Sequence, residues 1–255
     1  MIPARKSAAF IRWFSRHVEK RVHRDLQRVQ IRGLDAWQAA VAAHPVLLVS
    51  NHVSWWDVML GTYFVHRVIP GCDAFGMMDA ANLRGRPFFA KIGVFGVERG
   101  ARGQGLGVES LRYAQGLLDR PGRHVWVFPQ GDERPSTLRP LGFRKGAAVI
   151  AQAVPEAVVV PLAFRYELMK TDKPYAFLSV GDPVPRGADV AATRDAMEAA
   201  VLTELDRIDR HLCVARDPEF VTHCQAPPDR MGVLAERMLA WRHRKARAER
   251  ALPKA

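Results

Sequence analysis

The sequence predicts an α/β fold: a single domain with a central, largely parallel sheet flanked by helices, plus a basic amphipathic helix near each end. Two observations lead to this prediction. Beyond Gly33, short apolar runs alternate with stretches of helical periodicity, and strands separated by helices usually lie parallel in one sheet. Chemically versatile polar residues directly follow these runs. We therefore expect the functional residues in loops at strand ends, where α/β proteins place their sites.

Five apolar runs have the length and composition of strands. They are residues 46–50, 94–98, 124–128, 158–164 and 176–180. Helices are predicted over residues 188–212 and 231–250, with a polar, proline-containing linker between them. We divide the chain into an N-terminal helical segment (1–33), a main domain (34–215) and a linker with a basic C-terminal helix (216–255).

The N-terminal helix is predicted over residues 8–29, because apolar residues recur there at every fourth position. These are Phe10, Phe14, Val18, Val22 and Leu26. Arginine and lysine fill the other faces. Two interpretations stay open: the helix lies in a membrane interface with its cations on the headgroups, or it packs against the domain. The charge run at residues 242–250 is open in the same way, as a solvated face or a binding segment.

The charge balance predicts an anionic partner. Lysine and arginine total 38 against 26 aspartates and glutamates, which gives a formal net charge of +12 and an isoelectric point near 10.2. Lipid headgroups, nucleic acid and anionic cosubstrates are all compatible with such a surface.

Cysteine usage and apolar patterning favour the cytoplasm. The three cysteines are an odd number without framework spacing, which argues against a disulfide-stapled secreted protein. Arg12 and Arg16 interrupt the first apolar stretch, so no signal-peptide core forms. Two longer apolar stretches, residues 45–65 and 146–164, contain charged residues or prolines, and neither is predicted to span a membrane.

The most informative motif is SNHVSWWD, residues 50–57, directly after an apolar run. Residues five apart on a helix lie about 140° apart, so His52 and Asp57 meet only if the backbone turns between them. The spacing therefore predicts a loop that runs into a helix. In that geometry the carboxylate orients the imidazole and leaves its other nitrogen free to take a proton from a hydroxyl. Ser54 lies outside any Gly-x-Ser-x-Gly elbow, so a covalent serine mechanism has little support.

This motif resembles the signature of the glycerolipid acyltransferases, the family that includes lysophosphatidic acid acyltransferase. The family's His-x-x-x-x-Asp, usually preceded by Asn, is matched by Asn51, His52 and Asp57. A second family block resembles GVFGVERG at residues 93–100. The resemblance assigns Arg99 to the phosphate of the acceptor, a task suited to the planar guanidinium.

The third family block resembles FPQGDERP at residues 128–135, with Gln130 where many members have Glu and with Arg134 one residue later than usual. The resemblance places Gln130, Gly131 and Arg134 at the substrate, and Lys145 in the basic segment after this block. Gln130 can donate and accept hydrogen bonds but carries no charge, so an acceptor other than lysophosphatidate is open. A fourth block, VVVPLAF, follows in the family's order.

The resemblance implies direct acyl transfer that needs neither a metal nor a cofactor. His52 would deprotonate an acceptor hydroxyl, Asp57 would stabilise the imidazolium, and a thioester of coenzyme A or acyl carrier protein would donate the acyl group. Expected partners are this donor, a lysophospholipid or related lipid acceptor, and an anionic membrane surface. We therefore expect a cytoplasmic protein that is peripheral on the inner face of the cell membrane.

Two other functions stay open. A thioesterase or esterase would use the same His–Asp pair to activate water and would release free acid without any acceptor. A basic module that binds nucleic acid would tolerate loss of His52 and show a steep salt dependence. The sequence carries no recognisable reading helix or RNA-binding aromatic motif, so we expect no nucleic-acid partner.

Overall fold

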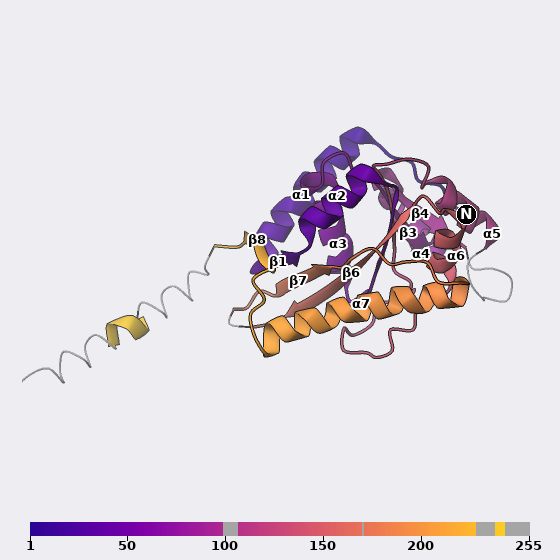
Figure 1. Ribbon diagram of the computed structural model, residues 1–255. Coiled ribbons are helices and arrows are strands. Elements are labelled where there is room, and N and C mark those ends of the chain that lie inside the picture. The colour runs from indigo at the N-terminus through magenta and orange to yellow at the C-terminus, as the bar shows by residue number, and fades with distance from the viewer. Residues whose placement is uncertain (99–106, 170, 228–237, 243–255) are drawn as a thin grey trace, which may run out of the picture.

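The computed structural model describes residues 1–98, 107–169, 171–227 and 238–242. Within them, an eight-stranded sheet lies between layers of helices (Figure 1). The strands are β1 (Arg28–Arg32), β2 (Val46–Ser50), β3 (Asp73–Asp79), β4 (Val94–Val97), β5 (Arg123–Val127), β6 (Val158–Glu167), β7 (Tyr175–Val180) and β8 (Val221–Gln225). The helices are α1 (Ala8–Asp25), α2 (Leu34–Ala43), α3 (Trp55–Tyr63), η1 (Phe64–Val68), α4 (Ala80–Gly85), η2 (Pro87–Ile92), α5 (Val108–Gly116), α6 (Gly146–Ala153) and α7 (Val190–Cys213).

The sheet is largely parallel, which confirms the predicted fold class. Its strand order is β4-β3-β5-β2-β6-β7-β1-β8. The first five strands in this order pair in parallel, whereas β7 is antiparallel to β6 and β8 is antiparallel to β1. The predicted strand at residues 46–50 is β2, which lies between β5 and β6. The loop after β2 therefore opens at the carboxyl end of a central strand.

Side chains alternate between two apolar cores, one on each face of the sheet. Leu48 of β2 packs into the core that α1, α2 and α3 cover, whereas its neighbour Leu47 packs into the core beneath α5, α6 and α7. Figure 1 shows α1 and α2 on one side of the strands and the long α7 on the other. Because both faces are covered, β2 is buried at every position.

Helix α1 packs against the domain along one face. Its N-cap Ser7 accepts a hydrogen bond from the backbone N–H of Phe10. Val18 and Val22 are fully buried against the core that α3 also covers, and each such burial stabilises the fold by roughly 1.5–3 kcal/mol. The opposite face is exposed, with Trp13 at 60%. One face of α1 therefore packs against the domain, as one of the two interpretations predicted. Contact of the exposed face with a membrane stays a prediction.

Three strands were not predicted. The helix that we expected to reach residue 29 ends at Asp25, because the chain becomes extended at Leu26 and enters β1. Strand β8 lies inside the expected linker and pairs with β1. Strand β3 lies in a stretch for which no strand was expected.

The ends of the chain contribute to the same sheet as the middle. Strand β1 comes from the segment 1–33 and β8 from the segment 216–255, and the three-part division itself stays a prediction. Residues 238–242 are helical, while the rest of the predicted C-terminal helix lies outside the described residues. In the described part of the chain, none of the helices combines the length and the apolarity that a membrane span requires.

Candidate active site

The loop between β2 and α3 has the predicted form. The strand ends at Ser50, and α3 begins at Trp55 with Ser54 as its N-cap. The Ser54 hydroxyl accepts a hydrogen bond from the backbone N–H of Trp56 at 3.1 Å, while the Asp57 carboxylate accepts one from the backbone N–H of Ser54 at 3.0 Å. This reciprocal pair is a capping box, which fixes where the helix starts.

His52 and Asp57 meet through this turn. The Nδ1 atom of His52 lies 2.7 Å from Oδ2 of Asp57. The Asp57 side chain is fully buried, and that of His52 is 17% exposed. Because a carboxylate only accepts hydrogen bonds, Nδ1 carries the proton and Nε2 keeps its lone pair in the neutral ring. Nε2 lies 3.9 Å from Oε1 of the exposed Glu133, so the free nitrogen is on the accessible side of the ring.

The Asp57 carboxylate has two further donors. Its Oδ2 atom accepts from the backbone N–H of Val53 at 2.6 Å, and its Oδ1 atom accepts from the hydroxyl of Tyr166 at 2.7 Å. Burial and the Asp57 charge raise the pKa of Tyr166 well above its ordinary value, so the phenol stays protonated and donates. Sequence reasoning missed Tyr166, because it lies 109 residues from Asp57, on strand β6, whereas Asp57 lies in α3.

Phe128 and Gln130 hold His52 from the side of β5. The Phe128 ring stacks on the imidazole at a centroid distance of 4.2 Å and an interplanar angle of 20°. Gln130, only 2% exposed, accepts from the backbone N–H of His52 at 2.7 Å and donates to the carbonyl of Leu141 at 3.3 Å. Only the amide can both accept and donate here, because an ionised glutamate has no proton to give. The Gln130 amide therefore makes two hydrogen bonds that an ionised glutamate could not both make.

Asn51 and Arg134 contact the loop around His52 or the strand beside it, whereas Lys145 is exposed at the start of α6. Both polar atoms of the Asn51 amide bond the backbone of Phe164, at 2.9 and 2.8 Å, so Asn51 ties the loop to β6. The backbone N–H of Arg134 donates to the carbonyl of His52 at 2.8 Å, and the Arg134 side chain is exposed. Lys145 is exposed at the start of α6.

Gly131 and Arg99 complete the predicted set. Gly131 has a φ of +78°, and its backbone N–H donates to the carbonyl of Phe128 at 3.0 Å. The positive φ favours glycine, and a Cβ atom there would lie 2.7 Å from the Arg144 guanidinium and displace it. Arg99, which was expected to bind phosphate, lies outside the described residues.

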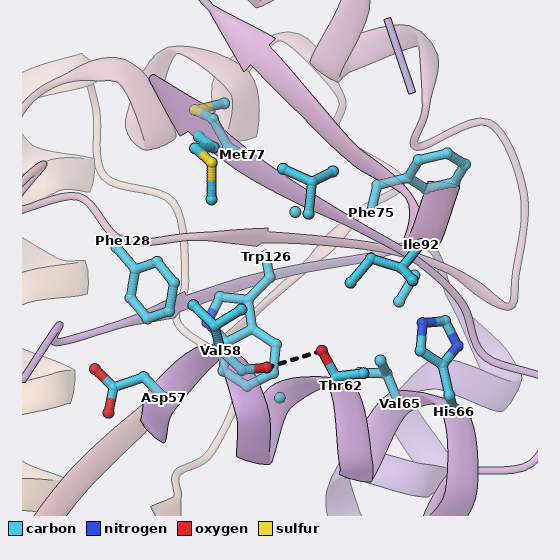
Figure 2. Close-up of a pocket in the computed structure, with 15 residues that line it drawn as sticks. Asp57, Val58, Thr62, Val65, His66, Phe75, Met77, Ile92, Trp126 and Phe128 are labelled. Atoms are coloured by element: carbon cyan, nitrogen blue, oxygen red, sulfur yellow. Dashed lines mark hydrogen bonds between the residues drawn. The ribbon is translucent and has the colours of Figure 1, made fainter. Parts of the chain in front are cut away.

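An apolar cavity begins at Asp57 and Phe128. Figure 2 shows it running between α3 on one side and the strands on the other, toward Phe75, Ile92 and His66. Apart from Asp57, its polar side chains are those of Thr62, whose hydroxyl donates to the carbonyl of Val58 at 2.8 Å, and His66. Burial lowers the pKa of His66 to about 4, so this wall is uncharged near neutral pH.

A second cavity shares Met77 and Phe128 with the first. Its walls are mostly apolar, and they also include Asp79, Arg144 and the first residues of α6. Backbone N–H groups at the start of a helix and a guanidinium both favour anions. Phe128, which stacks on His52, therefore lines both the apolar cavity that Asp57 lines and a second one that contains the Arg144 guanidinium.

A comparison with sequence families decides what this arrangement belongs to. The model of the family described as Acyltransferase matches residues 28–165. The chain belongs to the glycerolipid acyltransferase family. This match covers more than half of the chain, includes His52 and Asp57, and ends one residue before Tyr166. No curated protein matches the sequence significantly. Membership of the acyltransferases makes the chain an enzyme that transfers acyl groups, as its resemblance predicted.

The histidine, cysteine and acidic side chains of the described residues do not gather into a metal site. Across the residues that the structure describes, no cluster of three or more His, Cys, Asp or Glu side chains could hold a metal ion. His211 and His223 are each engaged elsewhere. The first accepts from the backbone N–H of Asp217 at 2.9 Å, and the second lies 3.0 Å from the hydroxyl of Tyr63.

Proposed function

We propose that this acyltransferase moves a fatty acyl group from a thioester of coenzyme A or acyl carrier protein to a hydroxyl of a lysophospholipid or related lipid. The observation that carries the proposal is the His52–Asp57 pair, since Asp57 and Phe128, the ring that stacks on His52, both line an apolar cavity. Concave sites with mostly apolar walls and a few placed polar groups are typical of small-molecule sites. A fatty acyl chain matches such walls, because the Thr62 and His66 side chains among them are neutral near pH 7.

In the proposed reaction, Nε2 of His52 takes the proton from the acceptor hydroxyl. The resulting oxygen nucleophile attacks the thioester carbonyl carbon, and the tetrahedral intermediate collapses with loss of the thiolate. The imidazolium then returns its proton to the thiolate sulfur, so the enzyme ends in its starting state. The buried Asp57 carboxylate stabilises the imidazolium and holds the ring with Nδ1 protonated.

In this proposal, the second cavity, which Arg144 lines, takes the charged parts of the substrates. Arg144 lines it, and the exposed Arg134 and Lys145 lie in the segments on either side of Arg144. These cations suit the phosphates of coenzyme A, of the carrier protein's prosthetic arm or of a lipid headgroup. Gln130 is buried with both ends of its amide engaged, so it contributes by holding the His52 backbone.

Replacing Ile92 by alanine should shift the acyl-chain preference toward longer chains. Ile92 lines the end of the cavity away from Asp57 (Figure 2) and is 5% exposed. Truncating it deepens the cavity by about three methylene-sized groups, and the fold loses about 2–5 kcal/mol. Competition among thioesters of graded chain length measures the shift. Ile208→Ala is the control, since Ile208 is fully buried beneath the other face of the sheet. An unchanged preference in Ile92→Ala would contradict this use of the cavity.

We further propose that the enzyme is cytoplasmic and docks on the anionic inner face of the cell membrane. The exposed side of α1 presents Arg12, Trp13 and Arg16 around a shallow depression. Aromatic contacts continue from Phe14 to Phe88, then to Phe89 and on to the half-exposed Trp55 beside His52. Exposed tryptophans among cations are typical of interfacial surfaces.

Replacing Trp13 by alanine should weaken binding to vesicles that contain phosphatidylglycerol about tenfold. The loss follows from removing a large, 60% exposed ring from the surface that enters the headgroup region. Cosedimentation with vesicles measures it, at low and at high salt. Leu168→Ala is the matched control, because Leu168 is 73% exposed and lies beyond the end of β6. Equal binding by both variants would contradict docking through α1.

The decisive test of the function is mass spectrometry of lipids after incubation with acyl-coenzyme A or acyl carrier protein thioester and a mixed panel of lysolipids. A new acylated lipid identifies the acceptor and supports the transferase. Free fatty acid in equal amounts with and without the panel favours a hydrolase and overturns the proposal. The panel includes lysolipids with zwitterionic and sugar headgroups beside lysophosphatidate, so that the product identifies the acceptor.

A further inference from the structure

Asp57 is held by more donors than a histidine partner requires. Four groups donate to it: Nδ1 of His52, two backbone N–H groups and the Tyr166 hydroxyl. The first three all act on Oδ2 and come from the loop just before α3, the helix that carries Asp57. Among the described residues, Tyr166 is the donor to Oδ1, and it comes from β6. The orientation of the carboxylate plane therefore depends on a residue outside the loop.

We propose that Tyr166 is a positioning residue for acyl transfer, which fixes the Asp57 carboxylate in the orientation that His52 needs. The inference rests on the proposed function of the His–Asp pair. A carboxylate held at one oxygen can rotate about its Cβ–Cγ bond, whereas one held at both oxygens cannot. Tyr166 thereby restricts the pair to a single geometry before substrate binds.

Strand β6 gives Tyr166 little freedom of its own. Its ring stacks with Phe164 at an interplanar angle of 7°, and Phe164 stacks with Trp126 at 12°. The backbone of Phe164 is bonded to Asn51, the residue before His52. Loop and strand are therefore joined twice, through Asn51 and through Tyr166. The second join lies two residues further along the same face of β6.

The hydroxyl also has an electrostatic effect with a definite sign. Its proton carries partial positive charge and lies against the carboxylate, so it offsets part of the negative potential that reaches His52. Removing it makes that potential more negative, which favours the imidazolium. The acidic limb of the pH–rate profile should then move to higher pH, because His52 keeps its proton over a wider range.

The test compares Tyr166→Phe with Tyr63→Phe in the acyl-transfer assay. Tyr166→Phe should lower kcat by about 10- to 100-fold, since a buried charged group loses a hydrogen bond, and leave KM for the thioester within about twofold. The acidic limb should shift upward. Tyr63 is the matched control, because it is 5% exposed and its hydroxyl pairs with His223 rather than with Asp57. Tyr63→Phe should change neither kcat nor the pH profile.

A wild-type kcat in Tyr166→Phe would overturn the proposal. So would a reduced kcat with an unmoved acidic limb, since that pattern marks a merely structural loss. A second measurement separates this result from failure of the proposed function: the titration of the His52 imidazole, followed by NMR without substrate. There the midpoint should be higher in Tyr166→Phe than in the wild type and in Tyr63→Phe, whatever reaction the enzyme catalyses. Equal midpoints would overturn the role of Tyr166.

Discussion

Acyl transfer should fall by at least about 10³-fold when His52 is replaced by alanine, because no other group stands in the position of the general base. Within the described residues, the other groups that face the ring of His52 are Phe128, the Asp57 carboxylate and the distant Glu133. The aromatic ring cannot take a proton. Without the imidazole, the Asp57 carboxylate still accepts from Val53, Ser54 and Tyr166, and the Glu133 side chain is 57% exposed and is not held at the base position by the imidazole. Mass spectrometry of the acylated product, under the conditions of the lysolipid panel, measures the rate.

The fold should survive this substitution. His52 forms no backbone cap. The substitution removes its stacking on Phe128, which contributes about 0.5–1.5 kcal/mol, and its hydrogen bond to Asp57, whose carboxylate keeps three other donors. His44→Ala is the control, since His44 is exposed at the end of α2, and it should retain full activity. Thermal unfolding of both variants separates lost chemistry from lost structure. If His52→Ala transfers acyl groups at the wild-type rate, another residue is the base and the proposed mechanism is wrong.

Replacing Asp57 by asparagine should damage both activity and stability. Four donors converge on the carboxylate, but an asparagine accepts at one oxygen only and points its NH₂ group at donors on the other side. Either the His52 side or the Tyr166 side is then left unsatisfied in a fully buried place. We expect a loss of about 2–5 kcal/mol in the free energy of unfolding and a drop of about 10²- to 10⁴-fold in kcat.

Denaturant unfolding and the acyl-transfer rate together check this result. Asp189→Asn provides the control, because Asp189 is the N-cap of α7 and its Oδ1 atom accepts from the backbone N–H of Ala192 at 2.8 Å. Asparagine caps helices about as well as aspartate, so that variant should match the wild type in both measurements. A stable, fully active Asp57→Asn enzyme would show that the carboxylate charge has no part in the reaction.

The centre of the fold could be predicted from the sequence because its signals are local and strong. Strand β2 is a continuous apolar run with both faces buried, and its predicted bounds are those observed. The turn to α3 follows from the spacing of His52 and Asp57, which a continuous helix would hold on different faces. Family resemblance then placed the chain correctly among the acyltransferases.

The edges of the fold could not be predicted, since their signals are weak or compete. Residues before β1 keep the four-residue apolar spacing of α1, which masks the alternation of Val29 and Ile31. Strand β3 contains no β-branched residue, and β-branched residues are the usual mark of a strand. Strand β8 is a mostly exposed edge strand and so lacks an apolar pattern. Its position is dictated by pairing with β1, which no local window contains.

In the site too, contacts between residues close in sequence could be predicted, and contacts between distant residues could not. His52 and Asp57 are neighbours in sequence, so their meeting could be inferred. Tyr166 reaches Asp57 across 109 residues, and Gln130 reaches the His52 backbone across 78. Only the order of strands in the sheet brings these residues together, with β2 between β5 and β6.

The place of β1 in the sheet has a consequence for how the chain folds as it is synthesised. β1 is the first of these eight strands to be made, yet both of its partners come much later in the chain. Arg28 of β1 lies opposite Tyr175 of β7 on one side and opposite Gln225 of β8 on the other. An early strand must therefore wait, with its edges unpaired, until nearly all of the chain has emerged. Contacts between such distant segments form slowly. The earlier pairing of β2 with β5 and β6 gives the growing chain a folded centre onto which its own beginning is added last.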